Sequence, residues 1–516
     1  MEISQCLEVL RKARNKDQDQ QEYFNQKLYA LSLIARDGKP GDMCYLTFLL
    51  HDPAASIREA ACATIVTLFQ KLHSRRESYE SLRGCAFSPD DIDYYASAFD
   101  REKLVSLLGI CSLNGNGYVR ARAVKGLSEI EHPHAIRFLL YRLADWVLPI
   151  RQAALQGLQN YLTPRYLDAL IESLPLLEWL QKVERTDLGP LYQQIITFLM
   201  EGNRPSVVAR FQGYKDPLRQ LVAQHLSRSP VISQDELRLL LSDRHFFIRS
   251  LALDHFDQLQ EPDVALLLED ASAKVRLETF YHLKGSADFN NIMARFVADN
   301  SAAIRRLARY TLQSTTHDFA AIYHRNLTEG QQLPGSLAGL AEVGGKRYSP
   351  TVETFLHHDR ARIRKLAFLA LRKLDDEKAY RFGLENMQSP YPGLRNAVID
   401  YLSTTPTDAV LQRARDIFAS GTLPQKVSML HLFHKIGGWA VAGDLMLGTI
   451  DENESLRKMS VNYLNAWRAK AVRLFTLPKP EETARAKRLF AFAWEQQEKQ
   501  NYFPSNPLTG LDFFFQ

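Results

Sequence analysis

Two small groups of histidines come nearest, by residue type and spacing, to a metal or acid–base site. His431 and His434 stand three residues apart in a predicted helix, and His357, His358 and Asp359 follow one another directly. A zinc site needs three or four ligands at matching depth, and neither group supplies them. The sequence also lacks the motifs of phosphate-binding loops, dinucleotide-binding folds, serine hydrolases and zinc proteases. We therefore expect no catalytic residue, no metal, no cofactor, and a protein that is not an enzyme.

A second pattern joins an acid to an arginine that follows it six positions later, directly after an apolar residue. The pairs are Asp52 with Arg58, Asp145 with Arg151, Asp243 with Arg249, Asp270 with Arg276, Asp299 with Arg305, and Asp451 with Arg457. Weaker copies are Asn114 with Arg120, Ser389 with Arg395, and Asp359 with Arg364, where the acid is only five positions before the arginine.

The acid of each step is expected in a turn before a helix, where a carboxylate accepts backbone N–H bonds and complements the helix dipole. The arginine is expected to reach the acid of a neighbouring copy, because a planar guanidinium with five donors suits such bridging. These residues are thus predicted to form a structural ladder rather than a catalytic site.

The segment from Ile363 to Leu374 shows which element carries the arginine. Its apolar residues recur at the spacing of one helix face, and a short helix is predicted before it, over 351–357. One such pair cannot bury its apolar face alone and needs copies beside it. Since 31 residues separate Arg120 from Arg151 and 29 separate Arg276 from Arg305, the period indicates two helices per unit. The predicted fold class is an all-α, right-handed α-solenoid of stacked helical hairpins.

The acid, the apolar residue and the arginine, followed by small residues such as Ala60, Ala61, Ala153 and Ala154, resemble HEAT repeats over about 41–467. The short period is similar to the bacterial type grouped with phycobilisome-lyase-like repeats. This resemblance implies stacked helix pairs that present a surface to a partner.

The repeat pattern divides the chain into five parts. We expect N-terminal capping helices over 1–40, repeats over 41–161 with an insert at 73–100, and an irregular helical segment over 162–215, where a longer helix pair is predicted. Repeats continue over 216–468, and a C-terminal capping helix with an aromatic tail occupies 469–516. The tail ends in Phe513, Phe514 and Phe515, which either fold back over Phe490, Phe492 and Trp494 or dock on another molecule. We expect the fold-back, because that apolar surface is adjacent in the chain.

Composition places the chain among ordinary proteins of aqueous compartments. It has 516 residues, 46% hydrophobic and 24% charged, with a net charge of +5, which is mild for a nucleic-acid binder. All five cysteines lie in the first 111 residues without a C-x-x-C pair, so we expect them to be reduced. No signal peptide and no run of about 18 apolar residues is visible, which predicts a cytoplasmic protein.

The predicted partner-binding surface is a basic concave groove in the middle of the chain. Positions one, five and eight after the repeat arginine should point away from the core, and with Arg309 they give Tyr281, Lys284, Arg306, Arg309, Tyr310, Lys365 and Arg372. A groove of this kind suits an acidic segment of a partner protein, which makes a non-enzymatic scaffold or adaptor the preferred function. The alternative is a nucleic-acid-binding protein similar to HEAT-like alkylpurine DNA glycosylases. A solvated face without a partner is also compatible with this pattern.

Overall fold

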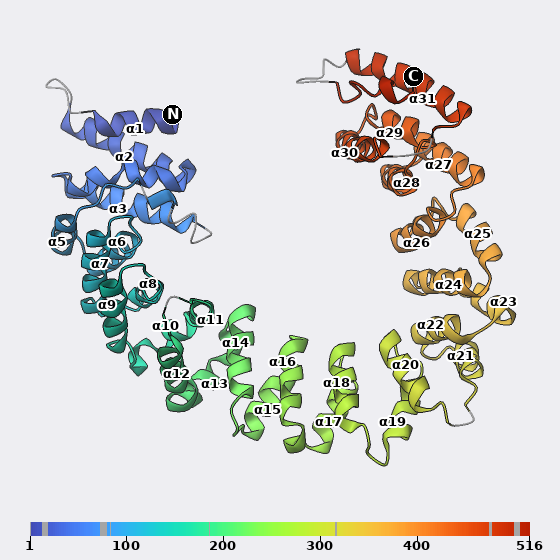
Figure 1. The fold of residues 1–516 in the computed structure, drawn as a ribbon, viewed down its shortest axis with the longest axis horizontal. Coiled ribbons are helices and arrows are strands. Elements are labelled where there is room, and N and C mark those ends of the chain that lie inside the picture. Colours follow the sequence, from blue (N-terminus) through green and yellow to red (C-terminus); the bar gives the residue numbers. More distant parts are fainter. Residues whose placement is uncertain are drawn as a thin grey trace. The chain divides into compact units, whose positions relative to one another are not determined.

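The computed structural model describes residues 2–12, 19–72, 80–82, 84–184, 186–314, 317–473, 477–499 and 506–515. Every regular element in these ranges is a helix, and none of them contains a strand. Antiparallel helix pairs follow one another along the chain (Figure 1), so the predicted all-α solenoid is confirmed. The chain divides into two compact units, Met1–Thr279 and Phe280–Gln516, which are described separately. None of the described helices is both long enough and apolar enough to cross a bilayer.

Unit 1 begins with two helices and continues with hairpins. Its regular part contains α1 (Ile3–Arg11), α2 (Gln20–Asp37), η1 (Pro40–Tyr45), η2 (Thr47–His51), α3 (Ala55–Gln70), α5 (Pro89–Ala98), α6 (Arg101–Cys111), α7 (Gly117–Glu129), α8 (Ala135–Arg142) and α9 (Leu148–Gln159). The helix α5 lies in the predicted insert, where Ser88 and Asp91 form a reciprocal capping box.

The segment 162–215 contains short helices where a longer helix pair was predicted, so that prediction is wrong. Its elements are η3 (Pro164–Tyr166), α10 (Leu167–Glu172), α11 (Leu174–Leu180), α12 (Gly189–Thr197), the π-helix η4 (Phe198–Gly202), α13 (Arg204–Ala209) and η5 (Phe211–Gly213). Proline stands in the first turn of η3, α11, α12 and α13. Proline tolerates a helix start but interrupts a helix interior, so each one begins a new element.

Regular hairpins resume after this segment. They comprise α14 (Asp216–Ser227), α15 (Gln234–Leu241), α16 (Phe246–Leu251), η6 (Ala252–Gln258), α17 (Glu261–Leu268) and α18 (Ala273–Leu283). The boundary between the two units falls inside α18.

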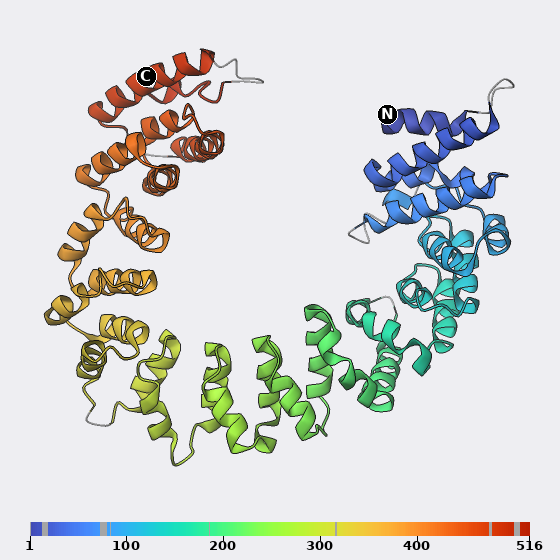
Figure 2. The same cartoon turned by 180° about the vertical axis from the view of Figure 1, so that it is seen from behind.

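Unit 2 consists of two layers of helices (Figures 1 and 2). The first-helix layer contains α19 (Phe289–Arg295), α21 (Phe319–Thr328), α23 (Ser349–Glu353), α25 (Asp376–Glu385), α27 (Asp408–Ser420), α29 (Ala442–Gly448) and α31 (Pro480–Lys499). The second-helix layer contains α20 (Ala302–Thr311), α22 (Leu333–Val343), α24 (Ala361–Leu374), α26 (Pro392–Leu402), α28 (Leu423–Ile436) and α30 (Glu454–Ala471). Each second helix packs against the next one, from α20 to α30. The short η7 (Lys346–Tyr348) precedes α23.

The second-helix layer is held by the apolar face that the sequence shows. In α24, Ile363, Ala367, Phe368, Ala370 and Leu371 are buried, and Phe368 contacts the rings of the neighbouring helices α25 and α26. Small residues let the backbones of neighbouring segments approach closely. A Cβ atom at Gly335, for example, would lie 1.8 Å from the carbonyl oxygen of Ala298. Burial along each hairpin interface therefore fixes which side of every second helix stays exposed.

The far end of unit 2 is closed by α31 and by the tail. Asp444 of α29, 2% exposed, accepts hydrogen bonds from Arg415 of α27 and Arg485 of α31 at 3.1 and 2.5 Å. The described part of the tail, 506–515, ends in η8 (Asp512–Phe515) and lies against α30 and α31. Phe515 stacks on Trp467 at 5.9 Å, and Arg468 donates to the Thr509 carbonyl at 2.8 Å.

The tail thus folds back and packs against α31, but the ring contacts of Phe514 and Phe515 are with Trp439 and Trp467, which lie outside α31. Phe515 also contacts Trp439, and it borders a small cavity with Phe490. Phe492 remains 49% exposed.

The prediction that all five cysteines are reduced is wrong for two of them. Cys44 of η1 and Cys85, which precedes α5, form a disulfide across a sequence separation of 41 residues. The other three cysteines, Cys6, Cys62 and Cys111, are free and buried. Pairing depends on which cysteines the insert brings together, which their spacing does not reveal. The cysteines therefore give no support to a cytoplasmic location.

Candidate functional site

The repeat arginine first binds its own turn. In nine copies, its Nη1 donates to the backbone carbonyl six residues before it, at 2.6 to 3.1 Å. Arg151, for example, donates to the Asp145 carbonyl at 2.7 Å. A bond within one copy explains why the six-residue spacing is constant even where neighbouring copies differ. Sequence reasoning did not identify this bond, although the fixed spacing was its signal.

The side chain six residues before the arginine closes the same turn. In each copy it accepts the backbone N–H two residues later, as in the 3.0 Å bond from Val147 to Asp145, which is an Asx turn. Six further Asp and Asn residues and Ser389 do the same. In the remaining copy His358 takes this role through Nδ1, at 3.1 Å from the Arg360 nitrogen. The assignment of Asp359 as the acid of that step is therefore wrong, because His358 occupies the sixth position.

The Nε and Nη2 groups of the repeat arginine then bind an aspartate of the next hairpin. Arg120 binds both carboxylate oxygens of Asp145 at 2.9 and 3.0 Å, and Arg249 binds Asp270 at 2.6 and 2.8 Å. Arg219 lies 2.8 Å from Asp243, and Lys426 donates to Asp451 at 2.8 Å. These contacts link successive hairpins within each unit.

Asp145 is the most enclosed of these acids, at 2% exposure. It accepts bonds from Arg120, Arg142 and the Val147 N–H. Burial alone would raise its pKa, but these three donors outweigh burial and hold the pKa of Asp145 below its usual range.

Where the next acid is missing, the arginine takes another partner. Arg305 pairs with Glu342. Arg364 lies 3.5 Å from the ring centroid of Tyr391, and Arg395 donates to Ser428 at 2.9 Å. All three substitutes occur in unit 2.

The predicted groove residues fall into two groups. Tyr281, Lys284, Arg306, Tyr310 and Lys365 are exposed. Arg309 is instead engaged, because it donates to the Tyr323 hydroxyl at 2.8 Å and to Glu342 at 2.7 Å. Arg372 is half-buried over the Tyr401 ring at 4.7 Å. These internal contacts leave Arg309 and Arg372 less accessible than the other five residues, and partner binding by the seven stays a prediction.

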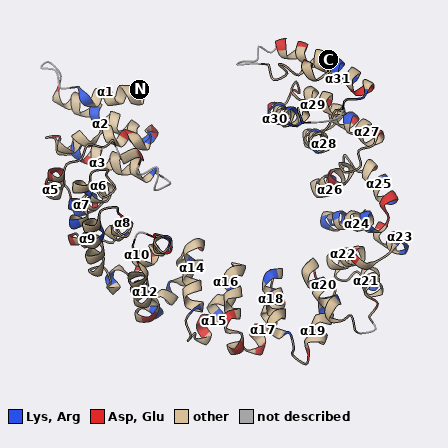
Figure 3. Ribbon diagram, viewed as in Figure 1, with Lys and Arg blue, Asp and Glu red and all other residues tan. Residues whose placement is uncertain are grey.

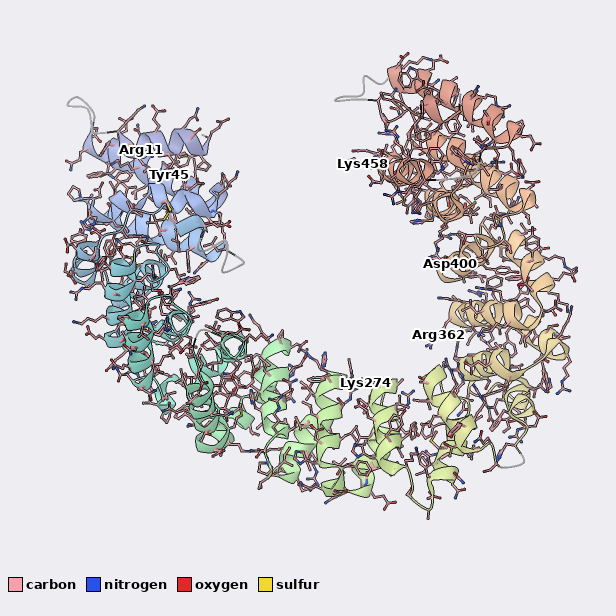
Figure 4. The ribbon with its side chains drawn as sticks, viewed as in Figure 1. Arg11, Tyr45, Lys274, Arg362, Asp400 and Lys458 are labelled. Carbon is pink, nitrogen blue, oxygen red and sulfur yellow. A yellow bond between two sulfur atoms is a disulfide. The ribbon has the colours of Figure 1, made fainter. Side chains whose placement is uncertain are left out.

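The structure adds Arg362 to the exposed cations. Positions two before, one after and five after the repeat residue lie on one helix face, and α24 places Arg362, Lys365 and Leu369 there. Figure 4 labels Arg362, Asp400 and Lys458, which extend from α24, α26 and α30 on the side away from the first-helix layer. Sequence reasoning missed Arg362 because it considered only positions after the arginine.

The two layers of unit 2 differ sharply in charge (Figure 3). The six second helices contain fifteen Lys and Arg residues and three acidic residues, a net charge of +12. The seven first helices contain ten Lys and Arg residues and eleven acidic residues, a net charge of −1. The whole chain carries only +5, so the basic excess is gathered on one layer.

Three of these cations form the candidate site. Arg306, Arg362 and Lys365 are exposed, and none makes an ion pair or hydrogen bond through its side chain to another described residue. We call these three residues the basic face. Because no described residue neutralises these three charges, an external anionic group would gain their full attraction.

A group of possible metal ligands in unit 1 does not fit a metal. Glu102, His132 and His134 bring ligand atoms within 4.8 Å of one another. However, His132 Nδ1 accepts the His134 backbone N–H at 3.2 Å, so the neutral ring carries its proton on Nε2. That N–H faces Glu102 at 2.9 Å, and the ring has no lone pair left for an ion. This contact is a structural link between α6 and the loop before α8.

No known family model matches the sequence. No curated protein matches it either. Among solved structures, the chain is similar to a crystal structure of Kap121p, with 10% identity and a TM-score of 0.37, covering 98% of this chain and 67% of that one. A structure of importin beta in an ammonium sulfate condition has 11% identity and a TM-score of 0.31, covering 99% and 76%. A structure of Kap121p bound to Pho4p has 10% identity and a TM-score of 0.36, covering 98% and 73%.

Proposed function

We propose that this protein is a non-enzymatic scaffold whose second-helix layer in unit 2 binds an acidic segment of a partner protein. The observation that supports this proposal is the net charge of +12 on the second helices against −1 on the first helices. A field of one sign along one layer attracts and orients a chain of the opposite sign.

The arrangement suits an extended segment. Neighbouring packed helices lie about 8–10 Å apart, so α20 and α24 are separated by roughly 20 Å. An extended chain advances about 3.3–3.6 Å per residue, so about six residues reach from Arg306 to Lys365. Tyr310, 68% exposed beside Arg306, offers apolar contact area next to the cations. The partner is therefore expected to carry several carboxylates within a short stretch.

A nucleic-acid partner is the second candidate, because the same cations could contact phosphates. One observation disfavours the glycosylase-like version of it. Trp467 is 3% exposed and packs against Trp439 and Phe515, so this ring is not available to line a base pocket.

Reversing the charges of the three residues of the basic face tests the proposal. The triple variant Arg306→Glu, Arg362→Glu, Lys365→Glu is expected to weaken binding of a rhodamine-labelled, fifteen-residue aspartate–glycine peptide by about tenfold or more. Each exposed pair contributes about 0.2–1 kcal/mol, and the reversal replaces three attractions by three repulsions of similar size. Fluorescence anisotropy in 50 mM salt measures the Kd.

The matched control reverses the same number of charges on the first-helix layer, with Arg381→Glu, Arg488→Glu and Lys499→Glu, and should retain wild-type affinity within about twofold. Equal losses in the two variants would show that only net charge matters and would contradict the proposed site. Displacement of the peptide by a 20-base-pair DNA duplex at concentrations well below those of unlabelled peptide would favour the nucleic-acid function instead.

A further inference from the structure

A cluster of two histidines and a tyrosine lies on the same layer as the basic face, between α28 and α30. The Tyr463 hydroxyl lies 2.5 Å from His431 Nδ1, and the ring of His434 stacks on Tyr463 at 4.0 Å with an angle of 10° between the rings. Lys426 is the fourth residue of α28, the position that the repeat arginine takes in α24 and α30. His431 stands five positions later, so it occupies the exposed helix face on which Lys365 and Tyr310 also lie. None of these groups takes part in the repeat ladder.

We propose that His431 and His434 make binding of the acidic partner depend on pH, with tighter binding under mildly acidic conditions. This inference rests on the proposed function and adds regulation to it. At neutral pH both rings are uncharged and the basic face binds alone. On acidification each ring gains a positive charge on the face where the partner's carboxylates lie.

The groups around the two imidazole rings determine the pH at which each ring gains a proton. His431 faces Tyr463 from α30, Asp400 from α26 and Lys435 from its own helix, while Asp400 is already paired with Lys435. Burial, followed by Lys435, outweighs Asp400 and lowers the pKa of His431. His434 faces Tyr463 and Lys470 from α30, and burial, Lys470 and His431 lower its pKa. Both rings are therefore neutral at pH 7.5 and gain protons below their ordinary value of about 6.5.

Protonation also changes the hydrogen bonding of the cluster. A charged His431 has no lone pair at Nδ1 and cannot accept the bond from the Tyr463 hydroxyl. The hydroxyl is then released as a donor for a partner carboxylate. A charged His434 keeps its place over the Tyr463 ring through a cation–π contact. Acidification thus adds two charges and one donor while the cluster stays together.

The direction of the pH dependence follows from the linkage between partner binding and proton binding. An acidic partner stabilises the protonated rings, so binding raises their pKa values and takes up protons. Affinity therefore increases as pH falls through the range below about 6.5 and levels off once both rings are charged even in the free protein.

The test uses the full chain and a rhodamine-labelled, fifteen-residue peptide of alternating cysteate and glycine, because sulfonates do not titrate between pH 7.5 and 5.0. At constant ionic strength, wild-type protein is expected to bind about three- to tenfold tighter at pH 5.0 than at pH 7.5, as two added surface charges predict. In the variant His431→Gln, His434→Gln the ratio of the two Kd values should fall below about twofold.

A control variant carries His324→Gln and His357→Gln, which lie outside the second-helix layer, and should keep the wild-type ratio. If wild type and the His431→Gln, His434→Gln variant show the same ratio, the inference is overturned while the proposed function stands. If wild type binds the peptide at neither pH, the proposed function fails and this inference fails with it.

Discussion

Replacing Asp145 with alanine is expected to lower the free energy of unfolding by about 3–5 kcal/mol, the range for breaking a buried ion pair from one side. Asp145 is 2% exposed and receives Arg120, Arg142 and the Val147 N–H. Its removal leaves two guanidinium groups without their acid in the interface between successive hairpins. Urea denaturation followed by circular dichroism measures the change.

The control for this prediction is Asp359→Ala. Asp359 is exposed, and the step assigned to it from the sequence is completed by His358, so the change should stay within about 0.5 kcal/mol. An Asp145→Ala protein as stable as this control would contradict the structural role given to the ladder.

Replacing Phe515 with alanine is expected to cost about 3–5 kcal/mol, the range for truncating a buried aromatic side chain. Phe515 is 2% exposed, stacks on Trp467 and contacts Trp439. The loss uncovers both tryptophans at the end of unit 2 and loosens the tail from α30. Thermal denaturation should show the lower midpoint, and tryptophan fluorescence should shift to longer wavelength before unfolding.

Phe513 supplies the matched control for this second prediction. It lies two residues earlier in the same helical turn but is 71% exposed, so Phe513→Ala should change the stability by less than about 0.5 kcal/mol. Equal effects at the two positions would mean that the tail does not pack in the register seen here.

The fold could be predicted from the sequence because the period and the apolar spacing are local properties. The helix over Ile363 to Leu374, for example, needs only its own residues to show which face is buried. The ladder was predicted in outline, since the acid and the arginine recur at a fixed step. The second role of the arginine was not predicted, because the fixed six-residue spacing was read as a link between copies and not as the signal of a bond from Nη1 to the carbonyl of its own turn. Membership of the phycobilisome-lyase-like subgroup stays a prediction.

The candidate site could be predicted only in part, for a physical reason. A cation is available to a partner only if no acid or ring reaches it, and that depends on residues far along the chain. Arg309 binds Glu342, 33 residues later, and Arg372 lies over the Tyr401 ring, whereas Arg306 and Lys365 have no such neighbour in the described part of the chain. The disulfide between Cys44 and Cys85 was missed for a similar reason. Pairing over tens of residues requires coordinates.

Binding of an acidic segment by the second-helix layer of unit 2 is tested most sharply by locating a bound acidic peptide on the protein. A fifteen-residue aspartate–glycine peptide with a central benzoylphenylalanine would be cross-linked by light to the full chain, and the joined residues identified by mass spectrometry. Cross-links are expected on the exposed faces of α20 and α24, around Arg306, Arg362 and Lys365, and should disappear in the triple charge-reversal variant. Cross-links gathered on α21, α25 or α31 instead, or unchanged by the charge reversal, would contradict binding by the second-helix layer.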